Sequence, residues 1–143
     1  MKTAQMHPTI TPGLLYDDAP RAIEWLVQAF GFEPVLVVPG AEGKIMHAQL
    51  KFGNGGVFLS SGGRTDVPGY YSTPRALGGK VPSGINAYVA DPDAHYAQAK
   101  ASGAEILIPI EDKPYGGRGY TCRDPEGHVW SFGSYDPWAG EGA

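Results

Sequence analysis

Two segments of this chain carry the same order of features, so the sequence contains an internal duplication. In the first segment, Asp18 precedes apolar residues at helical spacing that end at Gly31. In the second, Asp91 precedes a run of alanines at similar spacing that ends at Gly103. A unit of about 60 residues is marginally stable alone because it buries too little of its surface. We therefore expect the two copies to share one core.

Each copy is predicted to form a strand, a helix and then three strands. An aspartate before each helix is a typical N-cap, and Gly31 is a typical C′ residue. Residues 44–52 alternate between apolar and polar, and Asn54-Gly55 is a strong signal for a two-residue hairpin turn. The predicted elements are, in order, 9–16, 17–30, 35–38, 44–52 and 57–61, followed by 83–90, 91–102, 105–110, 119–123 and 128–133.

This order predicts an α+β fold with two tandem βαβββ modules in a single domain, residues 1–143. Module 1 is expected at about 9–61, module 2 at about 83–133, and a C-terminal tail at 134–143. The connecting segment, 62–82, is rich in Gly and Pro. A connection of this length is either a linker or a lid over a site, and we expect it to lie at the mouth of a binding site.

Composition and charge exclude several classes of partner. The chain has 15 acidic and 11 basic residues without a Lys/Arg cluster, which argues against nucleic-acid binding. It has no apolar run as long as a membrane span, and its first residues do not resemble a secretory signal, so we expect a cytoplasmic protein with no membrane partner. The single cysteine, Cys122, has no disulfide partner and is expected to be a reduced thiol.

The second copy also carries a family resemblance. The segment from Tyr115 to Tyr120, followed by Asp124-Pro125-Glu126-Gly127-His128 and the strand after it, is similar to the glyoxalase/bleomycin-resistance (vicinal oxygen chelate) superfamily. The likeness covers nearly the whole chain, from Thr9 to Trp138. It implies a curled mixed sheet that forms a half-open cup, with the helices on its outer face and a ligand inside. It also implies a homodimer.

The resemblance indicates where metal-dependent members would hold their ion, on the first and last strands of each module. The corresponding positions here are Thr11, Leu59, Gly84 and Ser131. None is a histidine or carboxylate, and Leu and Gly have no side-chain donor. We therefore predict no metal and no cofactor, which argues against metal-dependent glyoxalase, dioxygenase or fosfomycin-type chemistry.

Strand alternation predicts which side chains line the cup. Met46, Phe58 and Trp130 are expected beneath the helices, whereas His47 and Gln49 face inward. The tyrosines would suit either a ligand site or a half-buried strand. The residues expected to contact a ligand are Thr11, His47, Gln49, Leu59, Asn86, Tyr88, Tyr115, Arg118 and Ser131. The other histidines are expected in surface or turn positions.

These observations favour a metal-free protein that binds a small molecule, either a drug or a metabolite, and that resembles bleomycin-resistance proteins. The predicted lining has no pair of carboxylates and no nucleophile next to a base, so binding is favoured over catalysis. One alternative is a metal-independent lyase or isomerase in which His47 is the general base on a small carbonyl compound. Another is a scaffold or dimerisation module.

Overall fold

The computed structural model describes residues 7–64 and 69–139. The remaining residues include parts of the segment 62–82 and of the tail 134–143, which lie outside this description. Module 1 contains β1 (Gly13–Tyr16), α1 (Ala19–Phe30), β2 (Glu33–Pro39), β3 (Ile45–Phe52) and β4 (Gly55–Ser61). Module 2 contains β5 (Ile85–Tyr88), α2 (Pro92–Ala101), β6 (Glu105–Asp112), β7 (Arg118–Arg123) and β8 (Val129–Gly133). The described ranges also contain the short 3-10 helices η2 (Ala41–Gly43) and η3 (Arg75–Leu77).

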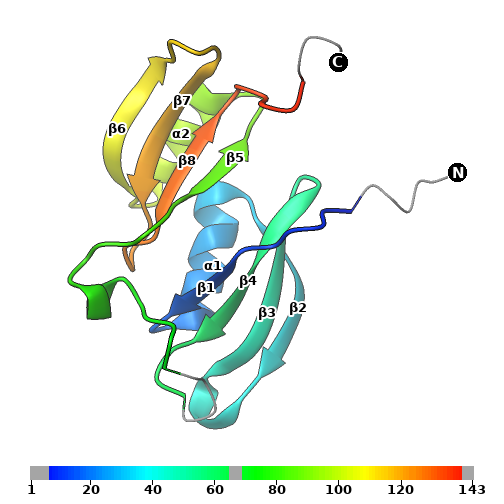
Figure 1. Ribbon diagram of the computed structural model, residues 1–143, viewed down its shortest axis with the longest axis vertical. Coiled ribbons are helices and arrows are strands. Elements are labelled where there is room, and N and C mark those ends of the chain that lie inside the picture. The colour runs from blue at the N-terminus through cyan, green and yellow to red at the C-terminus, as the bar shows by residue number, and fades with distance from the viewer. Residues whose placement is uncertain (1–6, 65–68, 140–143) are drawn as a thin grey trace, which may run out of the picture.

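The strands form two sheets, and the predicted pair of βαβββ modules is confirmed. Sheet 1 has the order β1-β4-β3-β2 and sheet 2 the order β5-β8-β7-β6. The first and last strands of each module are parallel neighbours, and the other pairs are antiparallel. The sheets lie one above the other with the helices behind them (Figure 1). We call the face of each sheet opposite its helix the open face.

The helices begin and end where the sequence predicts. Asp18 accepts a hydrogen bond from the Arg21 backbone N–H at 3.2 Å, and Gly31 ends α1 with φ of 89°. The buried residues of α1 follow the predicted helical spacing and are Ala19, Ala22, Ile23, Leu26, Ala29 and Phe30. None of the helices in the described ranges is long and apolar enough to cross a membrane.

The inward face of α2 differs from the prediction. Asp91 caps this helix, but the alanines of the apparent repeat are exposed; the buried residues are Pro92 and Ala99, and His95 and Tyr96 are half-buried. Counting from the capping aspartates, His95 stands where α1 has Ala22. A half-buried histidine therefore takes the helix position that the repeat assigned to alanine.

One aromatic core joins the two modules, as the duplication predicts. The Phe30 ring lies 5.3 Å from Trp130 and 4.6 Å from Phe132 between centroids. His95 lies in the same junction, with Nε2 2.9 Å from the Phe30 carbonyl oxygen and Nδ1 2.7 Å from the Tyr120 hydroxyl. Burial lowers the pKa of His95, although its hydrogen bond to Phe30 opposes this shift.

The turn between β7 and β8, residues 124–128, docks on the N-terminus of α1. Glu126 accepts hydrogen bonds from the two backbone N–H groups that precede α1, at 2.6 and 2.8 Å. Asp124, 4% exposed, accepts from the Tyr16 hydroxyl at 2.6 Å and the Trp130 indole at 3.0 Å. His128 Nε2 lies 2.8 Å from the Leu15 carbonyl oxygen. These contacts fix one module on the other.

Part of the connecting segment, residues 73–75, packs beside this turn. Thr73 and Pro74 are buried, and a Cβ on Gly127 would lie 3.0 Å from Pro74 Cβ. Arg75 forms an ion pair with Asp17 at 3.1 Å. In the part of the segment that the structure describes, no residue lines either of the two pockets reported below, and residues 65–68 of the predicted lid lie outside the described ranges.

Candidate functional site

The two hairpins of the modules have turns of different lengths. In the β3–β4 turn, Gly53 has φ of 59° and Asn54 has a negative φ, so Gly53-Asn54 forms a type II′ turn one residue before the predicted Asn54-Gly55 pair. The β7–β8 turn is longer, since Arg123 pairs with Val129. Because the two turns differ in length, an alignment of the modules through their turns shifts the residues of β4 by one position relative to those of β8.

This displacement reverses one predicted face, because successive side chains of a strand point to opposite sides. Leu59 lies beneath the helix with 1% exposure, whereas Phe58 lies on the open face with 39% exposure. Phe58 pairs with Gln49, and Leu59 pairs with the buried Ala48. The sequence expectation that Leu59 lines the open face is thus wrong, and Phe58 takes its place.

The corrected register also changes the set of positions at which a superfamily metal would be held. Gly13 pairs with Phe58 just as Asn86 pairs with Ser131, so Phe58 is the counterpart of Ser131. Thr11 and Ser131 each supply a hydroxyl, whereas Phe58 has a phenyl ring and Gly84 has only a hydrogen. This set of side chains does not fit a divalent metal. In the ranges 7–64 and 69–139, no group of three or more His, Cys, Asp or Glu residues could hold an ion.

His47 and Gln49 lie on the open face of sheet 1, as predicted. His47 Nε2 is 3.0 Å from Gln49 Oε1, and the Phe58 ring lies 4.8 Å from the imidazole between centroids. Met46, expected beneath the helix, is 47% exposed at an end of the sheet where the β2–β3 register shifts. The buried side chains of this strand are instead Ile45, Ala48 and Leu50.

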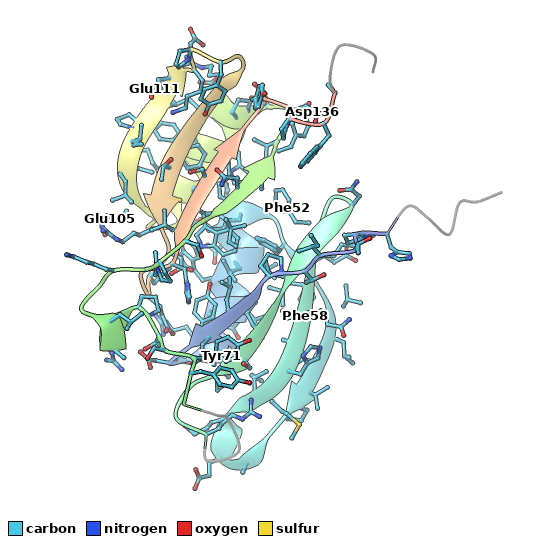
Figure 2. The ribbon with its side chains drawn as sticks, viewed as in Figure 1. Phe52, Phe58, Tyr71, Glu105, Glu111 and Asp136 are labelled. Carbon is cyan, nitrogen blue, oxygen red and sulfur yellow. The ribbon has the colours of Figure 1, made fainter. Side chains whose placement is uncertain are left out.

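A cavity of about 900 Å³, which we call the intermodule pocket, lies between the two modules. The tip of the β3–β4 hairpin (residues 52–57) forms most of its module 1 wall, and Pro12 and Phe32 complete it. Its module 2 wall comes from the open face of sheet 2 and from the tail, with Asn86, Tyr88, Tyr115, Arg118, Thr121, Ser131, Tyr135 and Trp138 among its residues. Figure 2 shows Asp136, another residue of this wall, across the intermodule gap from Phe52.

The predicted ligand-contacting residues divide between two places. The intermodule pocket contains all those from module 2, namely Asn86, Tyr88, Tyr115, Arg118 and Ser131. Thr11 and Gln49 line a second cavity of about 600 Å³ on sheet 1, which shares the β3–β4 turn as a wall. His47 lies next to Gln49 but lines neither cavity.

The sequence reasoning missed the β3–β4 turn and the tail as parts of the pocket. Tyr135 and Trp138 lie close together in a short tail, and this pair of aromatic residues was the sequence signal for a role of the tail in the site. The hairpin tip carried no such signal, because residues 53–56 are mostly glycine and their role depends on the position of module 2.

The cations at the pocket are held in ion pairs. Arg118 donates to Asp93 at 3.0 Å and to Asp112 at 3.2 Å, and these hydrogen bonds raise the pKa of its guanidinium. Lys113 pairs with Glu111 at 2.9 Å. On the floor, the Thr121 and Ser131 hydroxyls bond to each other at 2.7 Å.

Cys122 is buried on β7, and burial raises the pKa of its thiol to about 12. A thiol with this pKa stays protonated at neutral pH, which makes it a poor nucleophile. Cys122 therefore contributes to packing, in line with its predicted reduced state.

Comparisons with known proteins agree with the fold. Residues 7–132 match the Glyoxalase/Bleomycin resistance protein/Dioxygenase superfamily. An uncharacterised protein of Mycobacterium bovis is 38% identical over 132 residues, which are 90% of this chain and 84% of that protein. The crystal structure of TioX from Micromonospora sp. ML1 is similar with a TM-score of 0.71 and 36% identity, covering 88% of this chain and 97% of TioX. The fosfomycin resistance protein FosX from Listeria monocytogenes shares the fold, with a TM-score of 0.64 and 14% identity, covering 91% of this chain and 94% of FosX. The chain therefore belongs to the Glyoxalase/Bleomycin resistance protein/Dioxygenase superfamily.

Proposed function

We propose that this protein binds a small organic molecule, a drug or a metabolite, in the intermodule pocket and without a metal ion. The observation that supports this proposal is a cavity of about 900 Å³ that combines aromatic rings with a few polar groups. Ligand sites of small molecules have this size and this mixture of residues. The side chains at the superfamily metal positions, Thr11, Phe58, Gly84 and Ser131, are poor metal ligands, which supports binding without a metal ion. A cytoplasmic location remains the expectation from the sequence.

A thermal-shift screen with metabolites and antibiotics tests the binding. A ligand present at about 100 times its dissociation constant adds ~2.7 kcal/mol to the free energy of unfolding, so the melting temperature rises. Tyr88→Ala should abolish this rise, whereas Tyr71→Ala, at an exposed tyrosine that lines neither pocket, should preserve it. If no compound stabilises the protein, or if Tyr88→Ala responds like the wild type, the proposed site is wrong.

Elemental analysis tests the metal-free part separately. We expect no stoichiometric zinc, nickel or manganese after expression in medium supplemented with these metals. About one tightly held metal ion per chain would contradict the proposal, because structural and catalytic sites retain their ion through three or four ligands.

We also propose a homodimer in which a second copy covers the open face of sheet 1. Leu36 lies beside Gln49 on this face, and both Leu36 and Phe58 are exposed apolar side chains. Sedimentation of the wild type should give a dimer, and Phe58→Glu should give a monomer. Leu77→Glu, at an exposed position in η3, is the matched control and should remain dimeric.

A second candidate, a metal-independent lyase or isomerase acting on a small carbonyl compound, rests on the contact between His47 and Gln49. When His47 Nε2 donates to Gln49 Oε1, the other ring nitrogen remains available to accept a proton. The ligand found in the screen should be incubated with the protein and recovered. An unchanged ligand supports binding alone, whereas conversion that His47→Ala abolishes supports the enzyme.

A further inference from the structure

The C-terminal segment 134–138 lies beyond the residues that match the superfamily, yet it forms part of the intermodule pocket. It is held firmly on module 2. The Arg118 backbone N–H donates to Ser134 Oγ at 3.0 Å, and the Ser134 N–H donates to the Arg118 carbonyl at 2.9 Å. A Cβ on Gly117 would lie 2.5 Å from the Tyr135 backbone nitrogen, so the two backbones are in close contact. The segment is therefore a built wall of the pocket.

Four aromatic rings with much of their surface exposed line the pocket, two on this segment and two beside it on module 2. Tyr115 and Tyr135 are in edge contact, with centroids 5.0 Å apart. Tyr88 on β5 and Trp138 at the end of the segment expose 53% and 89% of their surface. Exposed rings at a cavity can each offer a face to a flat ligand, because aromatic groups pack by stacking or edge contacts.

The charges around these rings are mainly negative. Arg118 and Lys113 are engaged by three carboxylates, those of Asp93, Asp112 and Glu111. Asp136 adds a fourth carboxylate on the wall itself. An anionic ligand would have to compete with these carboxylates for the two cations, whereas a cationic ligand would meet both negative charge and aromatic faces.

We propose that the ligand of the intermodule pocket is a planar aromatic cation, held by the rings of Tyr88, Tyr115, Tyr135 and Trp138. This inference rests on the proposed binding function and specifies the chemical class of the ligand. The volume of about 900 Å³ admits a fused ring system of drug size.

Aminoacridine, a planar cation at neutral pH, is the probe, and acridine carboxylate provides the same ring with a negative charge. Tetramethylammonium is a cation without a ring. Titration by calorimetry should show that aminoacridine binds at least about tenfold more tightly than either control, the difference expected when both charge and ring contribute.

Variants of the tail test the position of the probe. Trp138→Ala and Tyr135→Leu should each weaken aminoacridine binding about fivefold or more, within the range of cation–π and stacking contributions. Trp138 is so exposed that its loss should not affect folding. Tyr71→Ala is the control, because Tyr71 lies on the linking segment far from Asp136 in Figure 2.

The outcomes separate this inference from the proposed function. If acridine carboxylate binds as tightly as aminoacridine, or if both tail variants bind like the wild type, the inference is wrong and the binding function stands. The same holds if a compound from the screen binds in a Tyr88-dependent way but aminoacridine does not. If neither the screen nor the probes give binding, the binding function itself is wrong.

Discussion

Among single residues, Asp124 is a buried carboxylate whose two oxygens accept five hydrogen bonds. One oxygen accepts from the Tyr16 hydroxyl and the Trp130 indole, and the other accepts from three backbone N–H groups of its own turn. Burial and the adjacent carboxylate of Asp124 raise the pKa of Tyr16 well above its usual value, so its hydroxyl remains a donor. Removal of this acceptor would leave several buried donors unsatisfied.

Asp124→Asn should lower the free energy of unfolding by about 2–4 kcal/mol, because an amide cannot accept all the hydrogen bonds of a carboxylate. Urea melts of the purified variant measure this loss. Asp136→Asn, at an exposed aspartate, should stay within about 0.5 kcal/mol of the wild type. Equal stability of the two variants would mean that Asp124 does not organise the junction.

The corrected register of β4 gives a second prediction for single residues. Leu59→Ala should cost about 2–5 kcal/mol, because it leaves a cavity in the core. Phe58→Ala should cost about 1 kcal/mol or less, since the side chain lies on the open face. Denaturant melts of both variants check the order. A larger loss for Phe58→Ala would restore the original face assignment.

At the scale of elements, the N-terminus of α1 has a local cap and a distant one. Asp18 caps it from the adjacent residue, and Glu126 reaches it from the β7–β8 turn of module 2. The N-terminal turn of a helix carries free N–H groups and a partial positive charge, so a carboxylate is favourable there. The β7–β8 turn of module 2 thus caps the N-terminus of a helix in module 1.

Glu126→Gln should lower the free energy of unfolding by about 1 kcal/mol through the loss of charge at the helix terminus. Hydrogen exchange at the Asp17 and Asp18 amides should become faster, because Glu126 accepts from both. Glu24→Gln, on the exposed side of α1, is the control and should change neither quantity. Unchanged exchange in Glu126→Gln would exclude the distant cap.

For the whole molecule, the junction around His95 should make stability depend on pH. The folded protein holds the pKa of His95 below its ordinary value of 6.5, and burial is the main cause. The unfolded chain therefore binds a proton more readily, so stability falls as the pH drops below about 6.5 and levels off below the folded pKa. Above pH 6.5 the contribution of His95 is fully present.

Urea melts of the wild type and of His95→Gln between pH 5 and 8 test this dependence. The wild type should lose stability toward acid, and the slope between about pH 6.5 and 5 should be smaller in His95→Gln, which cannot titrate there. His7→Gln, at an exposed histidine, should retain the wild-type slope. Identical slopes in all three proteins would assign the acid sensitivity to other groups.

Much of the architecture could be predicted because its signals are local. The capping aspartates, Gly31 and the alternation of 44–52 each depend on residues within one or two turns of chain, and the structure confirms the elements they predict. Which side chains of β4 point toward the helix could not be predicted from such local signals. It depends on the length of the β3–β4 turn, and both Gly53-Asn54 and Asn54-Gly55 are acceptable turn sequences.

The sequence by itself determined the two βαβββ modules, their caps and the shared core, because the spacing of apolar residues and turn residues specifies each element locally. Only the tertiary structure decided that the 124–128 turn docks on α1, that His95 lies at the module junction, and that the pocket uses the β3–β4 turn and the tail. These features depend on contacts between residues far apart in the chain. Such contacts follow from how two modules pack, and no local spacing encodes that packing.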